Sequence, residues 1–166
     1  MKTLIVVRHA KSSWDDPELS DFNRPLNSRG ERDAPRMAKR FKEKEITVNA
    51  MVSSPAVRAL TTCRVFADIL GYPEERIQTS KDLYHAGEGV ILNVLKNLKD
   101  QLVENEVVMI FGHNPGLTEF VNSLVEEDID NVPTAGVVCC KLNIERWKDM
   151  EWGCGEMEFF DYPKRQ

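Results

Sequence analysis

Short apolar runs alternate along this chain with segments of helical periodicity, and that alternation constrains the fold more than any other feature of the sequence. The runs at residues 4–7 and 107–111 are apolar throughout, which is typical of strands covered on both faces. Apolar residues recur at helical spacing in four further segments, residues 34–41, 60–70, 91–102 and 117–124. We therefore predict a three-layer α/β fold, with a mostly parallel central sheet and helices on both of its faces.

Cap and turn residues mark where the predicted elements begin and end. Additional strands are predicted at residues 50–53, 77–80, 137–144 and, as an edge strand, 150–160. Ser28 opens a segment with capping-box spacing, which predicts the start of the first helix. Ser54 and Asn114 each precede a proline, and this pairing of an N-cap residue with proline predicts the starts of two more helices. Gly71 predicts the end of the second helix.

Length and composition limit the class of protein. The 166 residues fit one domain spanning residues 1–166. The formal net charge is -5, whereas nucleic-acid-binding domains are usually basic, so we expect no nucleic acid partner. No apolar run approaches the roughly 20 residues of a membrane span, and the first residues do not resemble a signal peptide, so we expect a cytoplasmic protein without membrane attachment. The four cysteines lack C-x-x-C spacing and are predicted to be free thiols. The sequence leaves the oligomeric state open.

The three histidines of the chain all follow predicted strands. His9 ends the first strand, His113 ends the strand at 107–111, and His85 follows the third strand. Arg58 lies in the first turn of the helix after the second strand. Ligands of open α/β sheets bind outside the carboxyl ends of the strands, so these four side chains are expected at one site. One such residue alone is more often structural, but the coincidence of four indicates function.

Together these residues suit the transfer of a phosphoryl group. A neutral imidazole is a nucleophile, so His9 can accept a phosphoryl group as a covalent intermediate. The charged phosphoryl oxygens need fixed cations, which Arg8 and Arg58 can supply as planar donors, and His113 adds a further donor if it is protonated. Two residues that add positive charge are Arg24 and Lys11. A cationic pocket in an acidic protein fits a phosphorylated substrate.

The candidate residues fall in four short segments. These are residues 7–12 (VRHAKS), 24–30 (RPLNSRG), 53–62 (SSPAVRALTT) and 112–116 (GHNPG). Together they resemble the histidine phosphatase superfamily, which includes phosphoglycerate mutases, and within it the short SixA-type phosphohistidine phosphatases. The resemblance implies a phosphoglycerate mutase-like fold, His9 as the nucleophile, and Arg8, Arg58 and His113 around the phosphoryl group. Arg24 matches a basic residue of the short branch. The resemblance implies no cofactor, and no metal-binding pattern is present in the sequence.

The chain departs from the superfamily pattern at two positions. The first motif usually ends in glycine, where this chain has Ala10. Larger members carry a carboxylate general acid after the third strand, where this chain has His85, with Asp82 and Glu88 nearby but out of register. An alkoxide needs a proton in order to leave, whereas the imidazole of phosphohistidine can leave as a neutral ring. The lack of the acid therefore favours phosphohistidine over alcohol esters.

Three functions fit the sequence. The first is an enzyme that hydrolyses phosphohistidine, on a protein or peptide, through a phosphorylated His9. The second is a phosphatase of small phosphate monoesters with the same nucleophile and with His85, Asp82 or Glu88 as its acid. The third is a phosphate-binding regulatory module without turnover. The presence of both His9 and His113 favours an enzyme, and the lack of a long insertion between the third and fourth motifs favours an open pocket for a phosphorylated protein.

Overall fold

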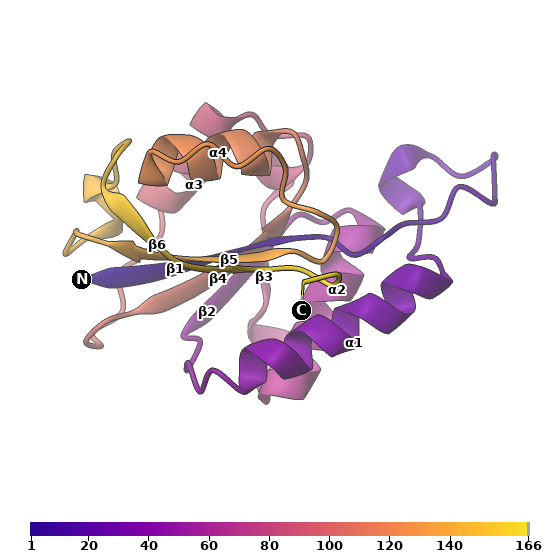
Figure 1. Ribbon diagram of the computed structural model, residues 1–166, viewed down its shortest axis with the longest axis horizontal. Coiled ribbons are helices and arrows are strands. Elements are labelled where there is room, and N and C mark those ends of the chain that lie inside the picture. Colours follow the sequence, from indigo (N-terminus) through magenta and orange to yellow (C-terminus); the bar gives the residue numbers. More distant parts are fainter. Residues whose placement is uncertain (166) are drawn as a thin grey trace.

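A six-stranded sheet forms the middle layer of the computed structural model, which describes residues 1–165 (Figure 1). The strands are β1 (Lys2–Arg8), β2 (Ala50–Ser53), β3 (Gln78–Thr79), β4 (Val107–Gly112), β5 (Val137–Leu142) and β6 (Gly155–Asp161). They follow one another across the sheet in the order β3-β2-β4-β1-β5-β6. The first four strands of this order are parallel, β5 is antiparallel to β1, and β6 is antiparallel to β5. The prediction of a mostly parallel sheet is confirmed.

Helices cover both faces of the sheet, as Figure 1 shows. One face carries α1 (Ser28–Lys42) and α2 (Val57–Leu70), and the other carries α3 (Glu88–Lys96) and α4 (Gly116–Val125). Short 3-10 helices occur at η1 (Asp21–Asn23), η2 (Glu74–Arg76), η3 (Lys81–Leu83) and η4 (Trp147–Asp149). Successive residues of a strand point to opposite faces, so Ile5 of β1 joins the apolar cluster of Phe66, while Val6 joins that of Phe120. The predicted three layers are confirmed. Over residues 1–165 no helix has both the length and the apolar character of a membrane span.

Side-chain hydrogen bonds shape the turns that lead from strand into helix at the carboxyl ends of β2 and β4. The hydroxyl oxygen of Ser54 accepts a hydrogen bond from the N–H of Ala56 at 3.2 Å just before α2. Before α4, the side-chain oxygen of Asn114 accepts hydrogen bonds from both the N–H and the hydroxyl of Thr118. Gly71 ends α2 with a left-handed backbone, as predicted. Helices α2 and α4 nevertheless start later than predicted: the N-caps are Ala56 and Pro115, and neither makes a side-chain cap bond, because the turn that contains each proline comes before the first helical residue. The bonds of Ser54 and Asn114 hold these turns close to the ends of β2 and β4.

The start of α1 lies one residue earlier than the capping-box spacing predicted. Asn27, not Ser28, is the cap, and its side-chain oxygen accepts a hydrogen bond from the N–H of Gly30 at 2.9 Å. The backbone of Lys11 passes directly against this first turn, because the N–H of Asn27 also donates to the carbonyl oxygen of Lys11 at 3.0 Å. The first turn of α1 is thereby joined to the segment that follows β1.

Replacing Gly30 with alanine is expected to destabilise the fold by about 1–3 kcal/mol, the usual cost of overpacking. A β-carbon at this position would collide with the carbonyl oxygen of Lys11, and backbone cannot move aside cheaply. Gly89 of α3 is the matched control, since a β-carbon there meets nothing within 4 Å. Urea denaturation of both alanine variants measures the difference, and equal free energies of unfolding would contradict the packing argument.

The third predicted helix ends earlier than expected. α3 stops at Lys96, and the side-chain amide of Asn97 donates to the carbonyl oxygen of Asn93 at 2.7 Å. Leu102 is fully exposed instead of completing the buried stripe of residues 91–102. The prediction was wrong because the helical spacing of apolar residues continues past the end of α3: Leu102 follows Leu98 by four residues, but the helix has already ended.

The cysteines are free thiols, as predicted. Cys63, Cys139 and Cys140 are buried, and Cys154 is partly exposed. Burial raises the pKa of the Cys63 and Cys140 thiols to about 12. Thiols of this kind are packing groups rather than nucleophiles.

Candidate active site

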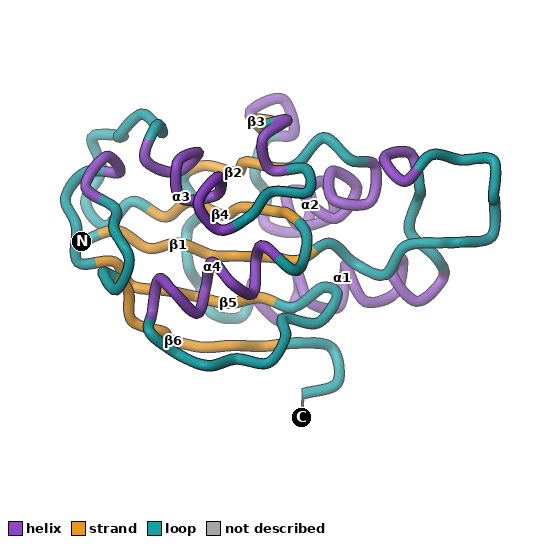
Figure 2. Tube along the Cα trace, turned by 90° about the horizontal axis from the view of Figure 1, so that it is seen from above, coloured by secondary structure: helices purple, strands orange, loops and turns teal. Residues whose placement is uncertain are grey.

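The two central strands of the sheet bring His9 and His113 together. β1 and β4 are parallel neighbours with Arg8 opposite Gly112, so each strand is followed directly by a histidine. The centres of the two imidazole rings are 5.2 Å apart. Figure 2 shows β4 and β1 side by side within the sheet. Strand order and register therefore fix the spacing of the two histidines.

A cavity of about 230 Å³ lies at this end of the sheet. Its lining includes every site residue predicted from the sequence, namely Arg8, His9, Lys11, Arg24, Arg58, His85 and His113. The lining residues that were not predicted are Ser12, Trp14, Asn114 and Thr134. His9 and His113 are buried, whereas Trp14 and His85 are exposed. The cavity thus has a buried end beside the two histidines and a mouth that opens to solvent.

His9 is held as a neutral imidazole. Its Nδ1 lies 2.7 Å from the carbonyl oxygen of Ala10, so Nδ1 carries the proton and donates it. Burial lowers the pKa of His9 to about 3, and the nearby guanidinium groups of Arg58 and Arg8 act in the same direction, while the hydrogen bond to Ala10 opposes them. The other ring nitrogen, Nε2, then keeps its lone pair at neutral pH and can act as a nucleophile.

His113 is fixed by a serine hydroxyl. Its Nε2 lies 2.8 Å from the Oγ of Ser54, the residue that also caps the turn before α2. Burial lowers the pKa of His113 to about 3, with smaller contributions from His9 and Arg58. By itself His113 is therefore neutral at pH 7, and not the imidazolium that the sequence analysis considered. A bound dianion would favour its protonated form.

The arginines present buried donors that make no hydrogen bond within the protein, although Nε of Arg24 lies 3.5 Å from the carboxylate of Asp21. Over residues 1–165, every buried side-chain nitrogen or oxygen without a hydrogen bond belongs to a residue lining this cavity. These atoms are Nε of Arg8, Nε and Nη1 of Arg24, Nε of Arg58 and Nδ1 of His113. Other nitrogens of the same groups anchor them: Arg8 donates to the carbonyl oxygen of Val132 at 3.1 Å, and Arg24 donates to the hydroxyl of Ser12 at 2.7 Å. Buried donors rarely stay unpaired, so this arrangement suits a bound anion.

A carboxylate that was not predicted lies beside the cavity. Asp21 accepts hydrogen bonds from Nη2 of Arg58 at 3.0 Å and from the hydroxyl of Tyr84 at 2.6 Å, and Nε2 of His85 is 3.1 Å away. Burial alone would raise the pKa of Asp21, but the hydrogen bonds from Tyr84 and Arg58 lower it to about 2. Asp21 is therefore ionised at neutral pH. It holds Arg58 in place and cannot itself donate a proton.

His85 stands at the mouth of the cavity on an unusual backbone. Its φ of 56° lies in the left-handed region, which residues other than glycine seldom adopt. Leu83 and Ala86 on either side are buried, and Ala86 packs against Gly116, where a β-carbon would collide with its carbonyl oxygen. This packing holds the segment while leaving the imidazole of His85 exposed.

The other candidate acids do not line the cavity. Asp82 is exposed on η3, and the carboxylate of Glu88 accepts a hydrogen bond from the hydroxyl of Ser123 at 2.7 Å. Among the residues that the structure describes, no cluster of three or more histidine, cysteine or acidic side chains could hold a metal ion. His85 is then the side chain at the cavity that remains available for proton transfer to a leaving group.

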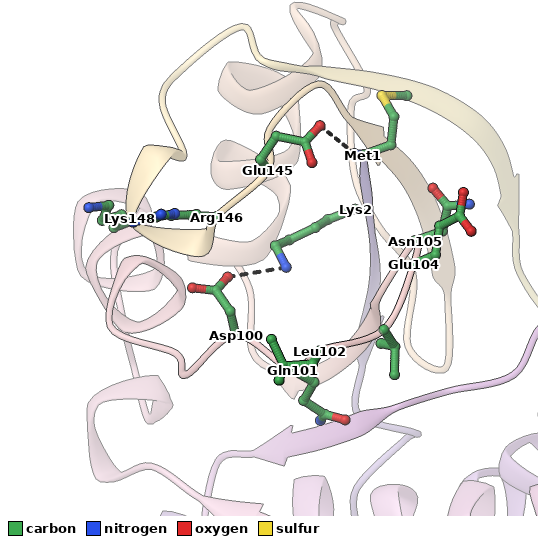
Figure 3. Close-up of a pocket in the computed structure, with 11 residues that line it drawn as sticks. Met1, Lys2, Asp100, Gln101, Leu102, Glu104, Asn105, Glu145, Arg146 and Lys148 are labelled. Atoms are coloured by element: carbon green, nitrogen blue, oxygen red, sulfur yellow. Dashed lines mark hydrogen bonds and ion pairs between the residues drawn. The ribbon is translucent and has the colours of Figure 1, made fainter.

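A larger cavity of about 640 Å³ lies at the other end of the strands, where β1 begins (Figure 3). Two of its cationic groups are paired with carboxylates: Lys2 lies 3.1 Å from Asp100, and the Met1 ammonium group lies 3.1 Å from Glu145. Lys2 also contacts the buried Glu106 at 2.8 Å. Because these groups neutralise one another, the smaller cavity with its unpaired donors is the better candidate for an anion site.

Comparison by sequence identifies one family. The model of the histidine phosphatase superfamily (branch 1) matches residues 4–91. An uncharacterized chloroplastic protein of Arabidopsis thaliana is 32% identical over 128 residues, which cover 74% of this chain and 59% of that protein. This chain therefore spans less than two thirds of the length of that relative.

Solved structures share the fold over nearly the whole chain. The protein histidine phosphatase SixA complexed with tungstate matches with a TM-score of 0.80 and 21% identity, covering 96% of both chains. A mycobacterial glucosyl-3-phosphoglycerate phosphatase matches with a TM-score of 0.71 and 11% identity, covering 98% of both chains. At these identities the likeness concerns the fold, and the predicted phosphoglycerate mutase-like architecture is confirmed.

Proposed function

We propose that this chain, which belongs to the histidine phosphatase superfamily, is a phosphatase that hydrolyses phosphohistidine on a protein or peptide through a covalent intermediate at His9. The observation that carries this proposal is the set of unpaired buried nitrogens around a neutral His9. A phosphoryl group spreads its charge over three oxygens, and such a group can take up these donors. The likeness to SixA, a protein histidine phosphatase, supports the same substrate class.

In this mechanism the reaction has two steps. First, the Nε2 lone pair of His9 attacks phosphorus while the P–N bond to the substrate ring breaks. The ring leaves as neutral imidazole, because its other nitrogen already carries a proton. Second, water attacks the phosphorus of phospho-His9 and the P–Nε2 bond breaks; the protons of the water stay on the inorganic phosphate that is released, and His9 is regenerated as a neutral imidazole with its proton on Nδ1. Arg8, Arg58 and His113 hold the phosphoryl oxygens in both steps.

The surroundings of the cavity favour phosphohistidine over esters of alcohols. An alkoxide leaving group needs a proton in the transition state, and the nearest carboxylate, Asp21, is held ionised by Arg58 and Tyr84. Phosphohistidine brings the necessary proton on its own ring. The mouth of the cavity is bordered by the exposed Trp14 and His85, which suits a phosphorylated side chain that remains attached to a protein.

One contact favours a second candidate, a phosphatase of small phosphate monoesters. Nε2 of His85 lies 3.1 Å from the carboxylate of Asp21, so this imidazole is held at the mouth of the cavity, where the leaving group of a bound ester would emerge. His85 is in this candidate the group that delivers a proton to the alkoxide. The same nucleophile would then serve a different class of leaving group.

Turnover of defined substrates distinguishes these functions. We expect the purified chain to hydrolyse a phosphohistidine peptide with a kcat/KM at least about tenfold above that for sugar phosphates, a ratio within the range that leaving-group recognition provides. A phosphoserine peptide controls for binding of the peptide itself. A preference for the sugar phosphates would replace the proposal with the second candidate. Phosphate binding without any turnover would indicate a regulatory module.

A further inference from the structure

Trp14 is a large aromatic side chain that lines the cavity and yet is 72% exposed. The other two tryptophans differ from it: Trp147 is fully buried, and Trp152 packs edge-on against Phe120 with ring centres 5.9 Å apart. Exposed aromatic side chains beside a polar pocket commonly contact a ligand or partner. The position of Trp14 therefore calls for a functional explanation.

One face of the indole is covered by a residue of the phosphate cavity. The guanidinium carbon of Arg24 lies 3.4 Å from the centre of the Trp14 ring. Arg24 is itself buried and anchored by the hydroxyl of Ser12. Because the indole remains largely exposed, its second face is open to solvent. Trp14 is thus a flat surface whose orientation is set by a residue of the cavity.

Backbone pairing places Trp14 opposite Arg24. Ser12 and Leu26 form an antiparallel bridge, and the N–H of Ser13 donates to the carbonyl oxygen of Pro25 at 2.8 Å. The loop between β1 and η1 extends from the body of the molecule beyond this point (Figure 1). Trp14 lies at the paired base of the loop, so its position does not depend on the conformation of the loop tip.

The buried donors determine how a substrate lies in the cavity. The unpaired nitrogens of Arg8, Arg24 and Arg58 are buried, so a phosphoryl group bound to them lies at the closed end of the cavity. The group bonded to phosphorus then extends toward the mouth, which the exposed Trp14 lines.

We propose that Trp14 determines specificity by stacking its free face on the phosphorylated imidazole ring of the substrate. The inference rests on the proposed function and assigns the residue that recognises the leaving group. An imidazole offers a flat ring for stacking, and its protonated form adds a cation–π attraction to the indole. The phosphoryl group is recognised by the arginines, and the ring that carries it by Trp14.

The variant Trp14→Ala tests this assignment with two P–N substrates. We expect its KM for a phosphohistidine peptide to rise about threefold to tenfold, the range that an aromatic pair provides. Phosphoramidate has the same type of bond but no ring, so its kcat/KM should change by less than about twofold. Inhibition by inorganic phosphate should also remain, since Arg24 stays anchored by Ser12. Trp14→Phe should retain most of the affinity for the peptide.

Trp152→Ala is the matched control, because Trp152 is 42% exposed and does not line the cavity. The proposal would be overturned if Trp14→Ala lowered kcat/KM equally for both substrates and also weakened inhibition by phosphate. That result would mean that the indole only supports Arg24. An unchanged KM for the peptide would overturn it as well. If the wild-type chain does not hydrolyse the peptide at all, the proposed function fails, and this inference fails with it.

Discussion

Replacing His9 with alanine is expected to lower turnover by more than about 10³-fold, because the substitution removes the nucleophile and with it the covalent pathway. The proposed intermediate gives a direct measurement. Wild-type protein mixed with substrate and quenched rapidly should carry one acid-labile phosphoryl group, and the variant should carry none. A variant that keeps more than about a tenth of wild-type turnover would show that another group attacks phosphorus.

The same variant also has a predicted effect on the pH dependence of stability. The pKa of His9 is about 3 in the folded chain, well below the ordinary value for an imidazole. As the pH falls from about 6.5 toward 3, the unfolded chain takes up a proton that the folded chain does not, so the free energy of unfolding decreases. His9→Ala should lose less stability than the wild type over this window. Urea denaturation at pH 7 and pH 5 measures the difference and shows that the loss of activity is not a loss of fold.

Replacing His113 with alanine is expected to lower kcat by about 10²–10³-fold, the usual effect of removing one donor to the transition state. His113 is buried next to His9, and its Nδ1 has no partner among the described residues, so this nitrogen is available to a phosphoryl oxygen. The amount of phospho-His9 that accumulates during turnover shows which of the two steps is slowed. Because the same donor serves both, formation and hydrolysis of phospho-His9 should slow together.

Ser54→Ala is the control for positioning. It removes the hydroxyl that fixes the ring of His113 at 2.8 Å but leaves the imidazole in place, so its effect on kcat should be smaller than that of His113→Ala. Circular dichroism checks that both variants are folded. If Ser54→Ala and His113→Ala are equally impaired, the orientation of the ring and not its donor capacity limits the reaction.

Most of the fold could be predicted because its signals are local. Continuous apolar runs at 4–7 and 107–111 identified the two central strands, and the two X-Pro pairs identified the turns before α2 and α4, although Ser54 and Asn114 are not the N-caps of these helices. The errors were local as well: Asn27 and not Ser28 caps α1, and Leu102 lies outside α3. The order of the strands was not predictable, since it depends on how the two faces are covered after the chain has collapsed.

The cationic side of the site was predictable, and the side chains that orient it were not. His9 and His113 end strands, and a general rule places such residues at one edge of an open sheet. Asp21 could not be assigned in this way, because it lies in the short 3-10 helix η1 and contacts Arg58 and Tyr84 across 37 and 63 residues of sequence. Its position three residues before Arg24 was the one available signal. Trp14 gave no periodic or motif signal, and it is identified by its exposure at the cavity and its contact with Arg24.

The bridge between Ser12 and Leu26 separates two tasks within one short stretch of chain. The residues before the bridge carry His9 directly after β1, and Asp21 and Arg24 beyond it return to the site, whereas the exposed tip at residues 15–20 can change in length or composition without shifting the strand. Mutations in the tip could therefore alter which phosphorylated molecules are accepted while the bond-breaking machinery stays intact. A fold with this division can acquire new substrates through a single excursion of about ten residues, the usual scale of a functional surface loop.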